Sequence, residues 1–94
     1  MAVTKLQSQE AQHDSGAILR SHGRDAMQFE LDGRVMTIAV DRGVGADLFY
    51  LPAAPQWDDK DLVAPDVAAM LKPVISEIEE FWGSRAAFRT INMA

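Results

Sequence analysis

The feature that most constrains this chain is an alternation of apolar and polar side chains on both sides of an Asp-Gly pair. Across residues 27–40, large apolar residues recur at every second position before and after Asp32-Gly33. This is the pattern of half-buried β-strands. A two-residue Asp-Gly loop is a preferred hairpin turn, because both of its positions need a positive φ. That loop length places Phe29 opposite Met36 and gathers the apolar side chains on one face, so we predict an antiparallel hairpin.

Three other segments have the character of strands, at residues 16–20, 47–51 and 85–91. The first two extend the hairpin into an antiparallel meander, with polar or glycine-containing loops between the strands. Pro52 ends the meander, since proline cannot continue a central ladder. The third segment follows a helical stretch and is predicted to close the sheet.

From Pro65 onward the sequence shows the period of an amphipathic helix. Its apolar stripe consists of Val67, Met70, Leu71, Val74, Ile78, Phe81 and Trp82. Pro65 suits the first turn, where its missing N–H is harmless, and Gly83 is typical of a C-terminal stop. Pro73 removes one hydrogen bond inside this helix, so we expect either a kink or a split into residues 65–72 and 73–82.

Together these elements predict an α+β fold. An antiparallel sheet of four to five strands, a β-meander with the Asp-Gly hairpin, packs against one C-terminal helix that is followed by a closing strand. The chain of 94 residues makes one domain, because a second core could not be filled. We place that domain at residues 16–94 and predict a flexible N-terminal tail at residues 1–15, which are rich in Gln, Ser and Thr. The strands cluster before the helix, so a parallel βαβ arrangement is not expected.

The sequence offers few groups for catalysis or metal binding. It has no cysteine, which removes disulfides, thiolate nucleophiles and Cys-ligated metals. Its two histidines, His13 in the predicted tail and His22 in a turn, lack the spacing of metal ligands. The pair Glu79-Glu80 is interpreted as solvated charge on the helix. We therefore predict no enzyme activity, no metal and no cofactor. A small enzyme or ligand-binding domain would need a pocket lined by His22 or Tyr50.

The net charge of −5 is concentrated in one part of the chain. Residues 57–82 hold seven acids and two bases, whereas the remaining residues hold seven of each. Such a segment speeds encounter with a basic partner and argues against nucleic acid, although helices also carry charge for solubility alone. Trp57, beside an acidic loop, is either a core residue or an interface anchor. The predicted partner-binding residues are Trp57, Asp58, Asp59, Asp61, Asp66, Glu77 and Glu80.

The order of these features resembles the small immunity proteins of bacterial polymorphic-toxin systems. The resemblance covers residues 17–91 and is one of layout. It includes the hairpin at 29–38, the strand at 47–51, a Trp-Asp-Asp loop at 57–59, a helix ending near 82–83 and a terminal strand. Only the hairpin and the Trp-acidic loop match in residue type. The resemblance implies a domain that binds and neutralises a cognate toxin without catalysis, and a basic toxin such as a nuclease suits the acidic loop and helix.

The alternative function is that of a structural or regulatory module that acts as a homodimer, by pairing edge strands or by burying Trp57. The longest uncharged apolar stretch, residues 35–40, is far shorter than the roughly 20 residues of a membrane span. The N-terminus also lacks the continuous apolar run of a signal peptide. We therefore predict a cytoplasmic protein without membrane association.

Overall fold

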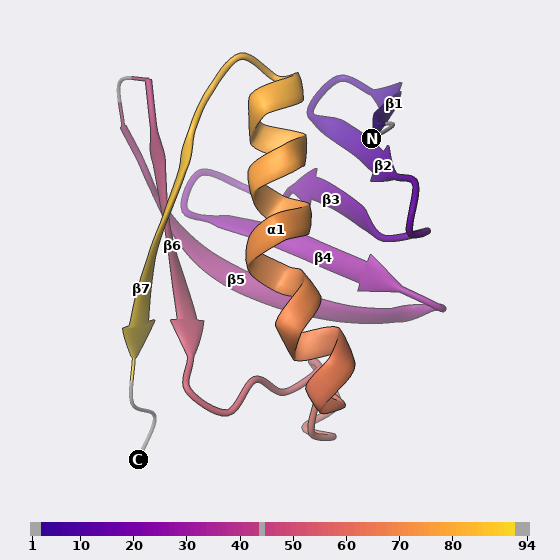
Figure 1. The fold of residues 1–94 in the computed structure, drawn as a ribbon. Helices are drawn as coiled ribbons and strands as arrows, with labels where there is room; N and C mark the ends of the chain where they lie inside the picture. Colours follow the sequence, from indigo (N-terminus) through magenta and orange to yellow (C-terminus); the bar gives the residue numbers. More distant parts are fainter. Residues whose placement is uncertain (1–2, 44, 92–94) are drawn as a thin grey trace.

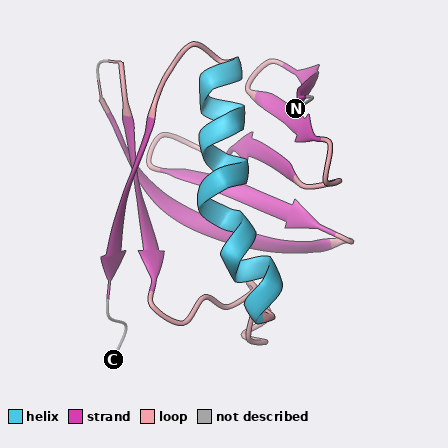
Figure 2. Cartoon of the chain, in the orientation of Figure 1, coloured by secondary structure: helices cyan, strands magenta, loops and turns pink. Residues whose placement is uncertain are grey.

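The computed structural model describes residues 3–43 and 45–91. These residues form a seven-stranded sheet, and one helix lies across one of its faces (Figure 1, Figure 2). The strands are neighbours in the sheet in the order in which they occur in the chain. The elements are β1 (Val3–Gln7), β2 (Glu10–His13), β3 (Ile18–Ser21), β4 (Ala26–Leu31), β5 (Arg34–Arg42), β6 (Asp47–Pro52), α1 (Pro65–Phe81) and β7 (Ala86–Ile91).

The predicted hairpin is confirmed as β4 and β5. Its register pairs Phe29 with Met36, as the two-residue loop requires. Asp32 and Gly33 form that loop with φ angles of 53° and 80°, both in the left-handed region that such a turn needs. The hairpin contributes five buried side chains to the core, namely Met27, Phe29, Met36, Ile38 and Val40.

The sheet is larger than predicted and mixed in direction. β1 to β6 form an antiparallel meander, whereas β7 lies parallel to β6. The expectation that no parallel βαβ arrangement occurs is therefore wrong for the last three elements. Parallel neighbours need a crossover, and α1 supplies it by returning the chain to the end where β6 begins. There Asp47 pairs with Ala86 and donates its N–H to the Arg85 carbonyl at 2.8 Å.

The prediction of a flexible N-terminal tail at residues 1–15 is also wrong for the part that the structure describes. Residues 3–13 form β1 and β2, which add two strands to the meander beside β3. Ala11 is completely buried and His13 is 9% exposed, because both side chains lie on the face of the sheet that packs against α1. The domain therefore begins before residue 16. Residues 1–2 of the predicted tail lie outside the described residues.

The helix α1 runs without a break through Pro73, which is exposed, and its axis changes direction midway along its length (Figure 1). A kink rather than a split is thus the outcome of the missing hydrogen bond. The buried side chains of the stripe include Leu71, Val74 and Ile78, and Ile75, which is not on the predicted stripe, is buried as well. Phe81, which we predicted on the stripe, is instead 46% exposed.

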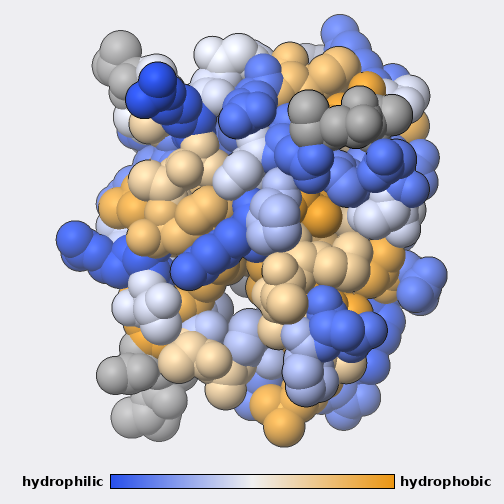
Figure 3. Space-filling view, viewed as in Figure 1, coloured by the Kyte–Doolittle hydropathy of each residue, from blue (hydrophilic) through white to orange (hydrophobic). Residues whose placement is uncertain are grey.

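The two faces of the sheet differ in character. The face under α1 carries the core, whereas the opposite face carries polar side chains such as Arg20, which forms ion pairs with Glu10 and Glu30. On the side of the molecule that presents α1, hydrophilic residues are interspersed with small apolar patches (Figure 3). Within the described residues, no helix has the length and apolar character needed to cross a bilayer.

Candidate functional site

Trp57 belongs to the core. Its side chain is 6% exposed and joins the apolar cluster under α1. The Arg34 guanidinium lies 5.4 Å from the centroid of its ring, within the range of a cation–π contact. Of the two interpretations that the sequence left open, the structure supports the buried one. In this conformation Trp57 offers little surface to a partner.

The acidic loop, residues 56–64, is attached to the side of β5 that β6 leaves uncovered. β6 pairs with β5 only from residue 39 onward. Along the part of β5 before residue 39, Asp58 makes the hydrogen bonds that a neighbouring strand would make. Its N–H donates to the Val35 carbonyl, and its carboxylate accepts hydrogen bonds from the N–H and the hydroxyl of Thr37, each at 2.8 Å. The loop thus satisfies backbone groups that would otherwise remain open at the edge of β5.

Arg34 holds the next two carboxylates of the acidic loop. Its guanidinium donates to Asp59 at 3.0 Å and to Asp61 at 2.7 Å. A hydrogen bond from the Asp61 N–H and then the Arg34 guanidinium lower the pKa of Asp59. The two side chains remain 62% and 70% exposed. These carboxylates are therefore fixed in position and still accessible to a partner.

We predict that Asp58→Ala loosens the acidic loop. The variant loses two hydrogen bonds from Thr37 to a carboxylate, and bonds to charged groups are among the stronger ones in proteins. Limited trypsin digestion with mass spectrometry should show cleavage after Lys60 at least about tenfold faster than in the parent chain. Asp66→Ala is the control, because it removes an exposed carboxylate just beyond the loop. Equal cleavage rates in the two variants would contradict the assigned role of Asp58.

The exposed large apolar residue of this region is Leu62, which the sequence analysis did not single out. Its side chain is 67% exposed and lies next to Asp61. Asp66, in the first turn of α1, is also exposed. The pattern of an apolar anchor surrounded by carboxylates is therefore present, with Leu62 in the place that we assigned to Trp57. The sequence contains a pattern from which this exposed anchor could have been predicted, since Leu62 follows three aspartates within a loop.

The structure separates the predicted partner-binding residues into two groups, one at the start of α1 and in the loop before it, the other in the second half of α1. Trp57, Asp58, Asp59 and Asp61 lie together in the acidic loop, and Asp66 follows at the start of the helix. The other two residues belong to the second half of α1. Glu77 accepts a hydrogen bond from His13 Nε2 at 2.6 Å, and Glu80 is exposed. Glu77 thus contributes to internal packing, and the accessible acidic surface is smaller than the sequence suggests.

His13 is a buried link between β2 and α1, not a surface residue of a tail. Beside its contact with Glu77, its Nδ1 lies 2.9 Å from the Ser15 hydroxyl and accepts the Ser15 N–H at 3.1 Å. This contact assigns the proton of a neutral imidazole to Nε2. The Asp14 carboxylate lies 3.1 Å from Nδ1.

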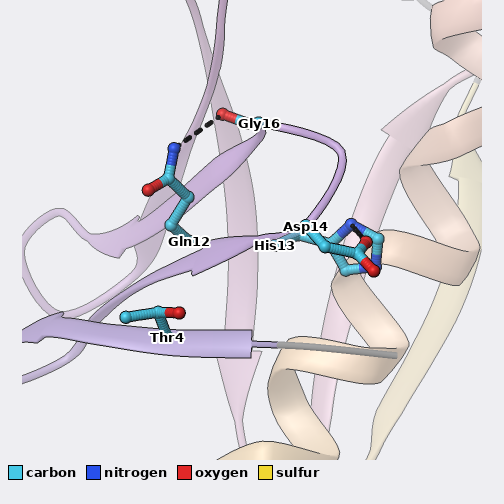
Figure 4. A pocket seen from close by; sticks show the side chains of 5 residues that line it. All are labelled: Thr4, Gln12, His13, Asp14 and Gly16. Atoms are coloured by element: carbon cyan, nitrogen blue, oxygen red, sulfur yellow. Dashed lines mark hydrogen bonds and ion pairs between the residues drawn. The ribbon is translucent and has the colours of Figure 1, made fainter.

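A shallow cavity of about 280 Å³ lies beside this histidine, and Figure 4 shows the side chains around it. It is lined by Thr4, Gln12, His13, Asp14 and Gly16. The contacts of His13 with a serine and a carboxylate have the composition of a hydrolase triad. Ser15, however, is not among the residues that line the cavity, and it shares one tight turn with the histidine. We therefore assign the cluster to the packing of β2 against α1.

Glu79 is the least expected residue of the structure. We interpreted it as solvated charge, but its side chain is 1% exposed in the interior beneath α1. Burial, and then the neighbouring Asp47 carboxylate through hydrogen bonding and charge repulsion, raise the pKa of Glu79 to about 8. Asp47 is itself only 8% exposed. The signal in the sequence was position: Glu79 follows Leu71 by eight residues and Ile75 by four, which places it on the apolar stripe.

The other residues considered for a pocket, His22 and Tyr50, come from different elements. His22 is exposed in the turn before β4, and Tyr50 donates a hydrogen bond to Asp41 on the open face of the sheet. Hydrogen bonding to that carboxylate raises the pKa of Tyr50. No group of three or more potential metal ligands occurs within residues 3–43 and 45–91.

Comparison with known proteins finds no matching family model, no matching curated protein and no matching solved structure. The functional assignment therefore rests on the geometry of the chain itself.

Proposed function

We propose that this chain is a non-catalytic protein-binding domain, an immunity-type inhibitor that neutralises a cognate bacterial toxin with a basic surface. The observation that carries the proposal is the exposed Leu62 on an acidic loop that internal hydrogen bonds hold in place. The layout that resembles immunity proteins supports the same function. The contact surface consists of Leu62, Asp59, Asp61 and Asp66.

Preorganisation is the physical advantage of this loop. A partner that binds it does not have to order the chain, because Asp58 and Arg34 already fix the loop against β5. Burial of one leucine side chain stabilises a complex by roughly 1.5–3 kcal/mol. Exposed carboxylates around that leucine steer a basic partner toward it and increase the rate of association.

The test is binding of the purified chain to the toxin encoded by the neighbouring gene, measured by surface plasmon resonance at several salt concentrations. We expect Leu62→Ala to weaken binding at least about tenfold, mainly through faster dissociation. We expect the double variant Asp61→Asn, Asp66→Asn to slow association and to flatten its salt dependence.

The matched control for this test is Glu80→Gln, which removes one negative charge from the opposite half of α1. It should change the association rate less than the double variant does. A chain that captures no toxin, or a Leu62→Ala variant that binds as tightly as the parent chain, would contradict the proposal.

A homodimer is the second candidate, because β1 and β7 are the edge strands of the sheet that residues 3–43 and 45–91 form. Two copies of β7 could pair and extend the sheet, as exposed edges tend to do. A dimer that buries Trp57 is disfavoured, since that side chain is already in the core of one chain. Sedimentation at micromolar concentration distinguishes the candidates: a monomer argues against the homodimer.

A further inference from the structure

A second cavity lies near the C-terminal end of α1, at the opposite end of the helix from the acidic loop. Its volume is about 310 Å³. It is lined by Gln9, Met27, Arg42, Asp47, Glu79, Trp82 and Ser84. These residues come from the β1–β2 turn, from three strands, from the end of α1 and from the segment that follows it, so distant parts of the chain must fold together to form the cavity.

This cavity is lined by two buried carboxyl groups, one without a hydrogen-bond partner among the described residues and one in a long ion pair. Glu79 Oε1 is buried and has no hydrogen-bond partner within the described part of the chain. The nearest approach of Arg42 to Asp47 is 3.9 Å, which is too long for a hydrogen bond. Arg42 instead donates to the Ser21 hydroxyl at 3.0 Å and is one-third exposed at the rim. An unsatisfied oxygen of this kind is rare in native interiors and needs an explanation.

The chemistry of the lining favours a cation over an anion. An anion could contact Arg42 only beside the Asp47 carboxylate, which would repel it. A cation could contact two carboxyl groups at once, and the indole ring of Trp82 provides an aromatic wall of the kind that attracts cations. A guanidinium is planar and has five N–H donors, so it can bridge both carboxyl groups.

We propose that this cavity is a recognition site for a guanidinium group, the side chain of an arginine presented by a peptide or protein. In this site the guanidinium donates to Glu79 Oε1 and to Asp47, and its flat face lies against Trp82. The site is independent of the acidic loop, so it goes beyond the proposed toxin surface and does not require it.

Binding of a guanidinium is coupled to a proton. Besides Glu79, the charged groups that line the cavity are Asp47 from β6 and Arg42 from β5. Because the pKa of Glu79 is raised to about 8, its carboxyl is mostly protonated at pH 7. The incoming cation stabilises the ionised form, so Glu79 releases its proton as the guanidinium enters. Affinity should therefore increase about tenfold or more between pH 6 and pH 8 and level off above that range.

The experiment is calorimetric titration of the full chain with methylguanidinium, in buffers of different ionisation enthalpy. We expect a dissociation constant on the order of millimolar, as befits so small a ligand, and release of close to one proton at pH 7. In Glu79→Gln the affinity at pH 8 should fall at least about tenfold and proton release should disappear. Glu80→Gln, the adjacent exposed carboxylate, is the matched control and should bind as the parent chain does.

Three results would overturn the assignment. They are an absence of binding, equal binding by Glu79→Gln and the parent chain, and stronger binding of acetate than of methylguanidinium. Titration with methylammonium, which represents the head group of lysine, distinguishes a lysine site from an arginine site. Weaker binding of methylammonium supports an arginine site, whereas tighter binding overturns that choice. Failure of the toxin-binding test leaves this measurement unaffected, because the ligand is a small cation and the site lies at the other end of α1.

Discussion

Glu79→Gln is expected to stabilise the folded chain at pH 8 to 9 and to change its stability little near pH 4. The parent carboxyl has an ordinary pKa when unfolded and a pKa raised to about 8 when folded. Between these values the folded state binds one proton more than the unfolded state, so stability falls as the pH rises. Glutamine does not titrate and keeps an N–H donor for Asp47. At alkaline pH the free energy of unfolding of Glu79→Gln should therefore exceed that of the parent chain by an amount on the order of 4 kcal/mol.

The measurement is the free energy of unfolding in urea at pH 5, 6, 7, 8 and 9, for Glu79→Gln and for Glu80→Gln. Glu80 is exposed, so removing its charge should shift the stability of the chain by only about 0.5 kcal/mol at any pH. The difference between the two variants should increase steadily with pH up to about 8 and then stay constant. Parallel pH profiles for the two variants would mean that Glu79 is not buried in solution.

Trp57→Ala is expected to destabilise the chain by about 3–5 kcal/mol, the usual cost of removing a buried tryptophan side chain. Trp57 is 6% exposed and packs in the cluster under α1. The variant also loses the contact of the Arg34 guanidinium with the indole ring, 5.4 Å from its centroid. The acidic loop should loosen as a result, because Arg34 also holds Asp59 and Asp61.

The measurement for Trp57→Ala is urea unfolding with fluorescence of the remaining Trp82 and circular dichroism. Leu62→Ala is the control, since Leu62 is 67% exposed and its truncation should cost less than about 0.5 kcal/mol. A small effect of Trp57→Ala, similar to that of Leu62→Ala, would show that Trp57 is a surface residue. It would also restore the interpretation of Trp57 as an interface anchor.

The local part of the fold could be predicted from sequence pattern. The Asp32-Gly33 hairpin was predicted with its register, because loop length and alternation both determine which side chains face each other. β1 and β2 were missed because their inner positions carry a small residue and a histidine, Ala11 and His13, where the alternation of large apolar residues is absent. The parallel pairing of β7 was missed because it depends on where α1 ends, which is a tertiary property.

The candidate site could be predicted only in part, because the partners of its carboxylates depend on tertiary contacts. Composition locates the acidic segment, but it does not show which carboxylates already have internal partners. Arg34, far from the loop in sequence, holds Asp59 and Asp61, and His13 holds Glu77. Glu79 contributes to the formal charge, yet it is largely neutral at pH 7 because of its raised pKa.

The strand order of the sheet has a consequence for synthesis on the ribosome. Six strands, ending at Pro52, can pair as soon as each is made, because each one contacts the strand made just before it. Their apolar face, including Phe29 and Phe49, has no cover until α1 has been translated. At roughly 5–20 residues per second, the stretch from residue 53 to the end of α1 at Phe81 takes about 1.5–6 s. For that interval the nascent chain exposes an apolar surface that is prone to aggregation, and synthesis of α1 provides the cover for it.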